Sequence, residues 1–118
     1  MFWHVSQNNS GGSFDFNEEY GITHHLVIEA PNVNAANAIY NYLINSYPNR
    51  GGDCPCCGDR WGDELYSDGK ETPMVYGQLV QEYKTLIKFL KEKEICVHYL
   101  DGRKEWFNAE KKKPGDKL

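Results

Sequence analysis

The sequence predicts an α+β domain in which two helices pack on an antiparallel sheet, with a cysteine-rich knuckle loop beside them. Three patterns support this prediction. Residues 22–29 alternate between the two faces of a half-buried strand. Residues 33–46 and 78–93 repeat apolar side chains at helical spacing. Residues 95–107 hold two short apolar runs around an Asp-Gly dipeptide, which is typical of a β-hairpin. Strands followed by helices that must cover a sheet indicate the α+β class.

Two strands are predicted near the start of the chain. The first covers residues 2–7 and ends at a dense cluster of turn-forming residues. The second covers residues 22–29. Because side chains alternate along a strand, the neighbouring His24 and His25 point to opposite faces, and we expect that they do not serve one site together.

The first predicted helix covers residues 33–46. Asn32 precedes it and offers a side-chain oxygen to a backbone amide of the first turn. The second predicted helix covers residues 78–93. Lysines near its end are well placed to interact with the negative end of the helix dipole. Its apolar stripe consists of Leu79, Tyr83, Leu86 and Leu90, flanked by Val80 and Ile87.

The predicted hairpin at the end of the domain has a two-residue type I′ turn at Asp101 and Gly102, the dipeptide that this turn prefers. In the register that follows, Cys96 and His98 share a face with Glu105. His98 and Glu105 then lie opposite each other across the two strands.

Size and charge limit the classes of protein. With 118 residues, the chain is long enough for one domain, which we place at residues 1–108, followed by a polar flexible tail at 109–118. The net charge of -4 disfavours a nucleic acid as partner. No apolar run reaches the roughly 20 residues that cross a bilayer, and the first residues lack the features of a signal peptide. We therefore expect a cytosolic protein without a membrane partner.

The charge is unevenly distributed along the chain. Residues 1–75 carry a net charge of -7, whereas residues 76–118 carry +3. The acidic part is a candidate contact face for a protein partner.

A zinc site is the first chemical hypothesis. Cys54 and Cys57 have the spacing of half a zinc ribbon, with a glycine directly after the second cysteine. A structural zinc ion needs four ligands, and no second Cys-x-x-Cys exists in the sequence. We choose Cys96 and His98 as the other two ligands, because alternation places them on one face of one strand.

Other readings of the cysteines stay open. If Cys96 and His98 are not the missing ligands, the next candidates are His24 and, behind it, His25, His4 and Cys56. The cysteines can instead be buried free thiols that act as small hydrophobic side chains. Cys54 and Cys57 can also form a redox pair.

Two pairs of arginine and tryptophan suggest a ligand-binding surface. Arg60 and Trp61 follow the cysteine cluster directly, and Arg103 and Trp106 repeat the combination in the hairpin. A guanidinium beside an indole can hold a phosphate and stack on a base. The alternative is structural: Trp61 packs in the core and Arg60 pairs with a neighbouring aspartate.

Catalysis has less support in the sequence. The sequence contains no phosphate-binding glycine loop and no nucleophile elbow. The predicted pair of His98 and Glu105 can orient a base, but cross-strand pairs of this kind are common on protein surfaces. We predict that the protein is not an enzyme.

The block Cys-Pro-Cys-Cys-Gly-Asp-Arg-Trp at 54–61 is the most specific motif of the chain. Together with the segments at 11–15, 21–30, 76–77, 97–103 and 105–107, it resembles a family of small tailed-bacteriophage proteins of unassigned function, over about residues 1–108. The resemblance implies an accessory protein that works in the cytoplasm of an infected bacterial host. Small phage accessory proteins often act by binding, and the resemblance assigns no catalytic residue.

These observations lead to one expected function and two alternatives. We expect a non-enzymatic inhibitor of host antiviral defence that sequesters a nucleotide-derived signalling molecule through Arg60, Trp61, Arg103 and Trp106. The first alternative is a protein that blocks a host defence protein through its acidic face. The second is a zinc-supported nucleic-acid-binding protein, whose affinity would depend strongly on salt.

Overall fold

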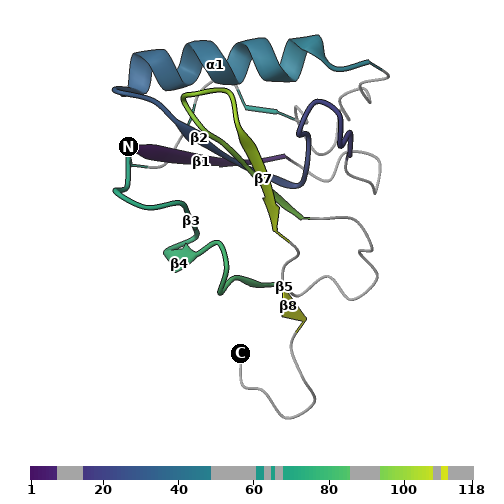
Figure 1. The fold of residues 1–118 in the computed structure, drawn as a ribbon, viewed down its shortest axis with the longest axis vertical. Coiled ribbons are helices and arrows are strands. Elements are labelled where there is room, and N and C mark those ends of the chain that lie inside the picture. Colours follow the sequence, from purple (N-terminus) through teal and green to yellow (C-terminus); the bar gives the residue numbers. More distant parts are fainter. Residues whose placement is uncertain are drawn as a thin grey trace.

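A four-stranded mixed sheet organises the fold (Figure 1). The structure is a computed structural model that describes residues 1–7, 15–48, 61–62, 65, 68–85, 94–107 and 110–111. Neighbouring strands of the sheet follow the order β1 (Phe2–Ser6), β2 (His25–Glu29), β6 (Ile95–His98) and β7 (Lys104–Phe107). The helix α1 (Val33–Ser46) follows β2 in the chain.

Four short strands complete the described elements. β3 (Met74–Val75) and β4 (Gln78–Leu79) form an antiparallel hairpin. β5 (Lys84–Thr85) pairs in parallel with β8 (Glu110–Lys111). The tail predicted at 109–118 stays a prediction, because most of it lies outside the described residues, as does the predicted knuckle loop at 54–58.

The predicted antiparallel sheet is wrong at its centre. β1 and β2 are antiparallel, as are β6 and β7, but β2 and β6 run parallel. Parallel neighbours need a long connection that returns the chain to the same end of the sheet, and the connection from β2 to β6 contains α1. The sheet is therefore mixed.

One of the two predicted helices is confirmed. α1 has the predicted bounds, and the Asn32 side chain accepts a hydrogen bond from the backbone amide of Ala35 at 2.9 Å, as expected for a helix cap. The buried stripe of α1 is Ala36, Tyr40 and Ile44, at steps of four residues. This stripe packs against the sheet in the larger core cluster, which includes Val5, Leu26, Ile28 and Cys96.

The second predicted helix, at 78–93, is wrong where the structure describes it. Residues 78–85 form β4, a turn and β5, while residues 86–93 lie outside the described residues. Val80 is 2% exposed and packs with Val27, Ile95 and Val97 on the face of the sheet opposite α1. Apolar side chains that we assigned to a helical stripe instead belong to a hairpin segment that covers this second face (Figure 1).

The hairpin of β6 and β7 is confirmed, but its turn is one residue longer than predicted. Tyr99 and Arg103 are the last paired residues, since the Tyr99 amide donates to the Arg103 carbonyl at 2.8 Å. The Gly102 amide donates to the Tyr99 carbonyl at 3.0 Å, and Gly102 has φ 93°. These contacts define a three-residue loop with glycine in the positive-φ position.

The longer turn shifts the pairing of β6 and β7 by one residue from the predicted register. Each side chain of β7 therefore lies on the opposite face of the sheet from the one predicted relative to β6. Cys96 lies opposite Trp106 and His98 lies opposite Lys104, so His98 is not paired with Glu105 as predicted.

Within the described ranges, no helix has the length and apolarity needed to span a bilayer.

Gly21 allows the chain to pass close to β6. Its φ is 68°, and a Cβ atom added there would lie 2.6 Å from His98 Cε1 and 3.0 Å from Cys96 Sγ. The His98 Nε2 atom hydrogen-bonds to the Gly21 carbonyl oxygen at 2.8 Å. A side chain at this position would therefore meet both a strained backbone and a filled space.

We expect Gly21→Ala to lower the free energy of unfolding by about 3 kcal/mol or more, because positive-φ strain and a steric clash add. Gly102→Ala is the matched control: Gly102 also has positive φ, but no atom lies within 4 Å of its added Cβ. The control should cost only about 1–2 kcal/mol. Urea unfolding of both variants measures the difference, and equal losses would contradict the close packing at Gly21.

Candidate functional site

A cluster of polar side chains is buried where β1, β2 and β6 meet. Ser6 lies directly opposite His25 in the register of β1 and β2. His25 pairs with the first residue of β6, and its backbone amide donates to the carbonyl of Glu94 at 3.0 Å. His4 lies two residues before Ser6, and therefore on the same face of β1. Strand pairing thus collects these groups from distant parts of the chain.

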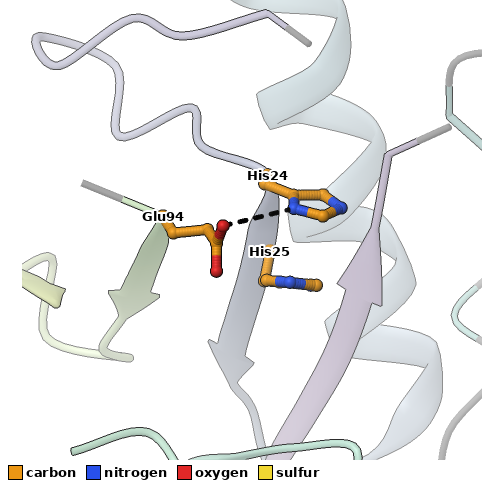
Figure 2. Close-up of side chains that lie close together, drawn as sticks. All are labelled: His24, His25 and Glu94. Carbon is orange, nitrogen blue, oxygen red and sulfur yellow. Dashed lines mark ion pairs between the residues drawn. The ribbon is translucent and has the colours of Figure 1, made fainter. Parts of the chain in front are cut away.

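His24, His25 and Glu94 form the part of the cluster that can hold a metal ion (Figure 2). Each residue offers one ligand atom, and the three atoms lie within 4.8 Å of one another. The Nδ1 atom of His24 is 3.9 Å from Glu94 Oε1, and the two imidazole rings are stacked with centroids 3.9 Å apart. His25 is 0% and Glu94 is 1% exposed.

The predicted separation of His24 and His25 is wrong. We expected the two rings on opposite faces, because we placed both residues inside one strand. β2 begins at His25, so His24 lies in the bend before it and does not follow the alternation of the strand. Its ring can therefore stack on that of His25.

A hydroxyl group links His25 to His4. Ser6 Oγ lies 2.6 Å from His25 Nδ1 and 2.8 Å from His4 Nε2, so it can accept from one ring and donate to the other. The Tyr76 hydroxyl donates to Ser6 Oγ at 3.2 Å. The ring of Tyr76 also makes edge contacts with His4 and His25, with centroids 4.9 and 5.5 Å apart.

Burial keeps these imidazoles uncharged. Loss of solvent lowers the pKa of His25 to about 2, with a further contribution from the neighbouring His24 and His4. Burial and His24 lower the pKa of His4 to about 4. Both rings are therefore neutral at pH 7, which is the form that binds metal ions and accepts hydrogen bonds.

The Nε2 atom of His25 is buried and has no hydrogen-bond partner among the residues that the structure describes. Buried polar atoms are almost always paired, because an unpaired one has lost its bond to water. A ligand at this nitrogen would restore the lost interaction.

A pocket of about 290 Å³ opens beside the cluster. His4 belongs to both, and the other lining residues are Phe2, Asp68, Lys70, Met74, Tyr76 and Gly77. The pocket walls are held together by two backbone hydrogen bonds between Phe2 and Lys70, each 2.8 Å long. The turn of the β3–β4 hairpin supplies the opposite wall.

Tyr76 has an uncommon backbone conformation for a large side chain. Its φ is 50°, and Gly77 follows with φ 78°, so the two residues form the tight turn between β3 and β4. Asparagine, aspartate or glycine suit this position with less strain. The turn places a tyrosine ring against His4 at the pocket while leaving the residue 62% exposed.

The structure describes only part of the predicted zinc site. Cys54 and Cys57 lie outside the described residues. Cys96 and His98 lie on one face of β6, and both are buried. Burial raises the pKa of the Cys96 thiol to about 12 and lowers that of His98 to about 4. The four-ligand zinc site therefore stays a prediction.

The predicted ligand-binding residues are only partly described. Arg60 lies outside the described residues. Trp61 is 2% exposed, and its indole donates to the Tyr47 hydroxyl at 2.9 Å, so the alternative that it packs in the core is confirmed. The half-buried Trp106 packs against the same core cluster. Arg103 is exposed, pairs with Asp101 at 3.1 Å and covers the ring of Tyr99.

The pocket and the role of Glu94 were not predicted from the sequence. Glu94 precedes a strand and belongs to no recognisable motif, so its closeness to His24 and His25 becomes visible only through the pairing of β2 and β6. The sequence contains one weak indication of the pocket: Tyr76 stands directly before Gly77, and a tyrosine is an unusual residue for a tight turn.

The fold and site define a small mixed-sheet protein with a buried histidine cluster beside an aromatic-lined pocket. The chain belongs to the family described as "Domain of unknown function (DUF7296)", whose model matches residues 1–115. No curated protein and no solved structure matches the chain.

We expect Ser6→Ala to lower the free energy of unfolding by about 1–2 kcal/mol, because two buried imidazoles lose their shared hydroxyl partner. Ser46→Ala is the control. The Ser46 hydroxyl donates an exposed hydrogen bond to the Tyr42 carbonyl of α1, and its loss should change stability by less than about 0.5 kcal/mol. Urea unfolding compares the variants, and equal small effects would contradict a stabilising role for the Ser6 bridge.

Proposed function

We propose that this protein binds a small planar molecule in the pocket beside His4 and does not transform it. The single observation that carries the proposal is the conformation of Tyr76. A bulky residue held at φ 50° costs stability, and strained residues cluster at functional sites. Here the strained residue forms a wall of the pocket and contacts its histidine.

The lining of the pocket indicates the chemical class of the ligand. The rings of Phe2 and Tyr76 and the thioether of Met74 offer apolar surface to a flat ring. Lys70 and Asp68 are exposed residues of the same lining, so they can meet a phosphate and a hydroxyl or amino group. A nucleotide-derived molecule combines these features.

The size of the pocket favours a single nucleotide unit. Pockets for drug-sized ligands have volumes of about 300–1,000 Å³, and this pocket of about 290 Å³ lies at the lower end of that range. A base with one phosphate fits this volume better than a dinucleotide does. We therefore propose this pocket, in place of Arg60, Trp61, Arg103 and Trp106, as the site of the nucleotide-derived ligand.

The electrostatics of the cluster support binding without chemical turnover. A general base works best when its pKa is near the working pH. His4, with a pKa of about 4, and His25, with a pKa of about 2, are weak bases at pH 7. Ser6 is hydrogen-bonded to both rings and to Tyr76, which suits a structural bridge.

The biological setting that we propose follows the resemblance to small bacteriophage proteins. A protein that sequesters a nucleotide-derived signal in the cytoplasm of an infected bacterium would inhibit host antiviral defence without being an enzyme. Blocking of a host protein through the acidic face and binding of nucleic acid stay predictions from the charge pattern.

Titration calorimetry with AMP, GMP, ADP-ribose and cyclic dinucleotides tests the proposal. We expect a mononucleotide to bind with one molecule per chain. Tyr76→Gly should weaken that binding by at least about tenfold, because one pocket wall is lost. The same change relieves positive-φ strain, so the unfolding temperature should move by less than about 5 °C.

Tyr42→Ala is the matched control for Tyr76→Gly. Tyr42 is a tyrosine of α1 that is 72% exposed and does not line the pocket, so its removal should leave the affinity unchanged. An absence of heat with every nucleotide tested, or equal affinities for Tyr76→Gly and the unchanged chain, would refute the proposed pocket.

A further inference from the structure

We propose that His24, His25 and Glu94 bind one divalent transition-metal ion of the zinc class. The site is separate from the pocket, and its argument does not depend on the nucleotide ligand. It is also separate from the predicted site of Cys54, Cys57, Cys96 and His98.

The donor set has the chemistry of a transition-metal site. Imidazole nitrogens and a carboxylate oxygen are ordinary zinc ligands, and two histidines with one carboxylate also suit iron(II), cobalt(II) and manganese(II). The three candidate ligand atoms already lie within 4.8 Å of one another. Such a set distinguishes this group from a cluster of surface carboxylates.

The distance between His24 Nδ1 and Glu94 Oε1 is closer to that of two ligands of one metal ion than to that of a direct hydrogen bond. The distance of 3.9 Å between Nδ1 and Oε1 is too long for a hydrogen bond. Two ligands of a tetrahedral zinc ion lie roughly 3.3 Å apart. Small side-chain rotations therefore suffice to bring the two atoms onto one ion.

The burial of the group supports a bound cation. A carboxylate that is 1% exposed needs a nearby positive charge or several hydrogen bonds. A divalent ion between the carboxylate and the two imidazoles would place a positive charge beside this buried carboxylate.

His25 is prepared for metal binding by its neighbours. Its Nδ1 atom contacts Ser6 Oγ at 2.6 Å, whereas its Nε2 atom has no hydrogen-bond partner in the described part of the chain. Histidine ligands commonly bind the metal through one nitrogen and donate a hydrogen bond from the other. Ser6 can accept that bond and hold the ring in place.

The geometry also provides access and an open position. The side chain of His24 is 14% exposed, so an ion can reach the group from solvent on that side. Three protein ligands leave at least one position of a tetrahedral ion free for water or another small ligand.

Cys96 and His98, the two described members of the predicted cysteine site, lie on the face of the sheet opposite His25. His25 pairs with Ile95, whereas Cys96 pairs with Leu26 and faces α1. Because neighbouring residues of a strand point to opposite faces, His25 and Cys96 cannot contribute to one ion. Variants at one site therefore leave the other intact.

Metal binding to the full-length, metal-free chain tests the proposal. We expect zinc(II) to bind with one ion per chain by calorimetry, and cobalt(II) to give visible absorption without a thiolate charge-transfer band. His24→Gln and Glu94→Gln should each weaken binding by at least about a hundredfold, because a direct ligand is lost. Circular dichroism verifies that each variant is folded, and the partly exposed His24 gives the variant with the smaller effect on packing.

Cys54→Ser and Cys96→Ser are the controls, and both should retain the affinity of the unchanged chain. Three results would overturn the proposal: no stoichiometric binding of zinc(II) or cobalt(II), full affinity in the folded His24→Gln variant, or loss of binding in the Cys54→Ser variant together with a thiolate band in the unchanged chain. Nucleotide binding is measured separately, so failure of the pocket and failure of the metal site are distinguishable.

Discussion

The structure depends on the burial of the first four residues of β2. Residues 25 to 28 are all 0% exposed, which requires cover on both faces and a paired strand on both edges. β1 and β6 occupy the edges, while α1 and the segment around Val75 and Val80 cover the faces. A shift of one residue in the pairing would exchange the two faces, so the register of β2 determines which side chains meet elsewhere.

The polar cluster is a direct consequence of this register. β2 begins with a histidine, and its burial carries an imidazole into the interior, where Ser6 of the paired strand reaches it. The residue before β6 is drawn to the same point, which brings in the carboxylate of Glu94. Buried polar groups of this kind are costly unless they are paired, and for this reason we place the proposed metal site at this cluster.

The pocket and the histidine cluster share one side chain. His4 lines the pocket and contacts Ser6, which in turn contacts His25. Two hydrogen bonds therefore connect a side chain of the pocket lining with one of the proposed metal ligands. The strained turn at Tyr76 belongs to the same unit, because its hydroxyl reaches Ser6 and its ring contacts both histidines.

The sequence by itself determined what depends on near neighbours: the α1 helix with its Asn32 cap, the alternating strands, and the existence of the last hairpin. Only the tertiary structure decided the parallel pairing of β2 with β6, the two short strands at 78–85 in place of a helix, and the meeting of Ser6, His25 and Glu94. Periodicity and capping act over a few residues, so local patterns reveal them. Strand register and the choice of covering segments are set by burial across the whole domain, which no local pattern contains.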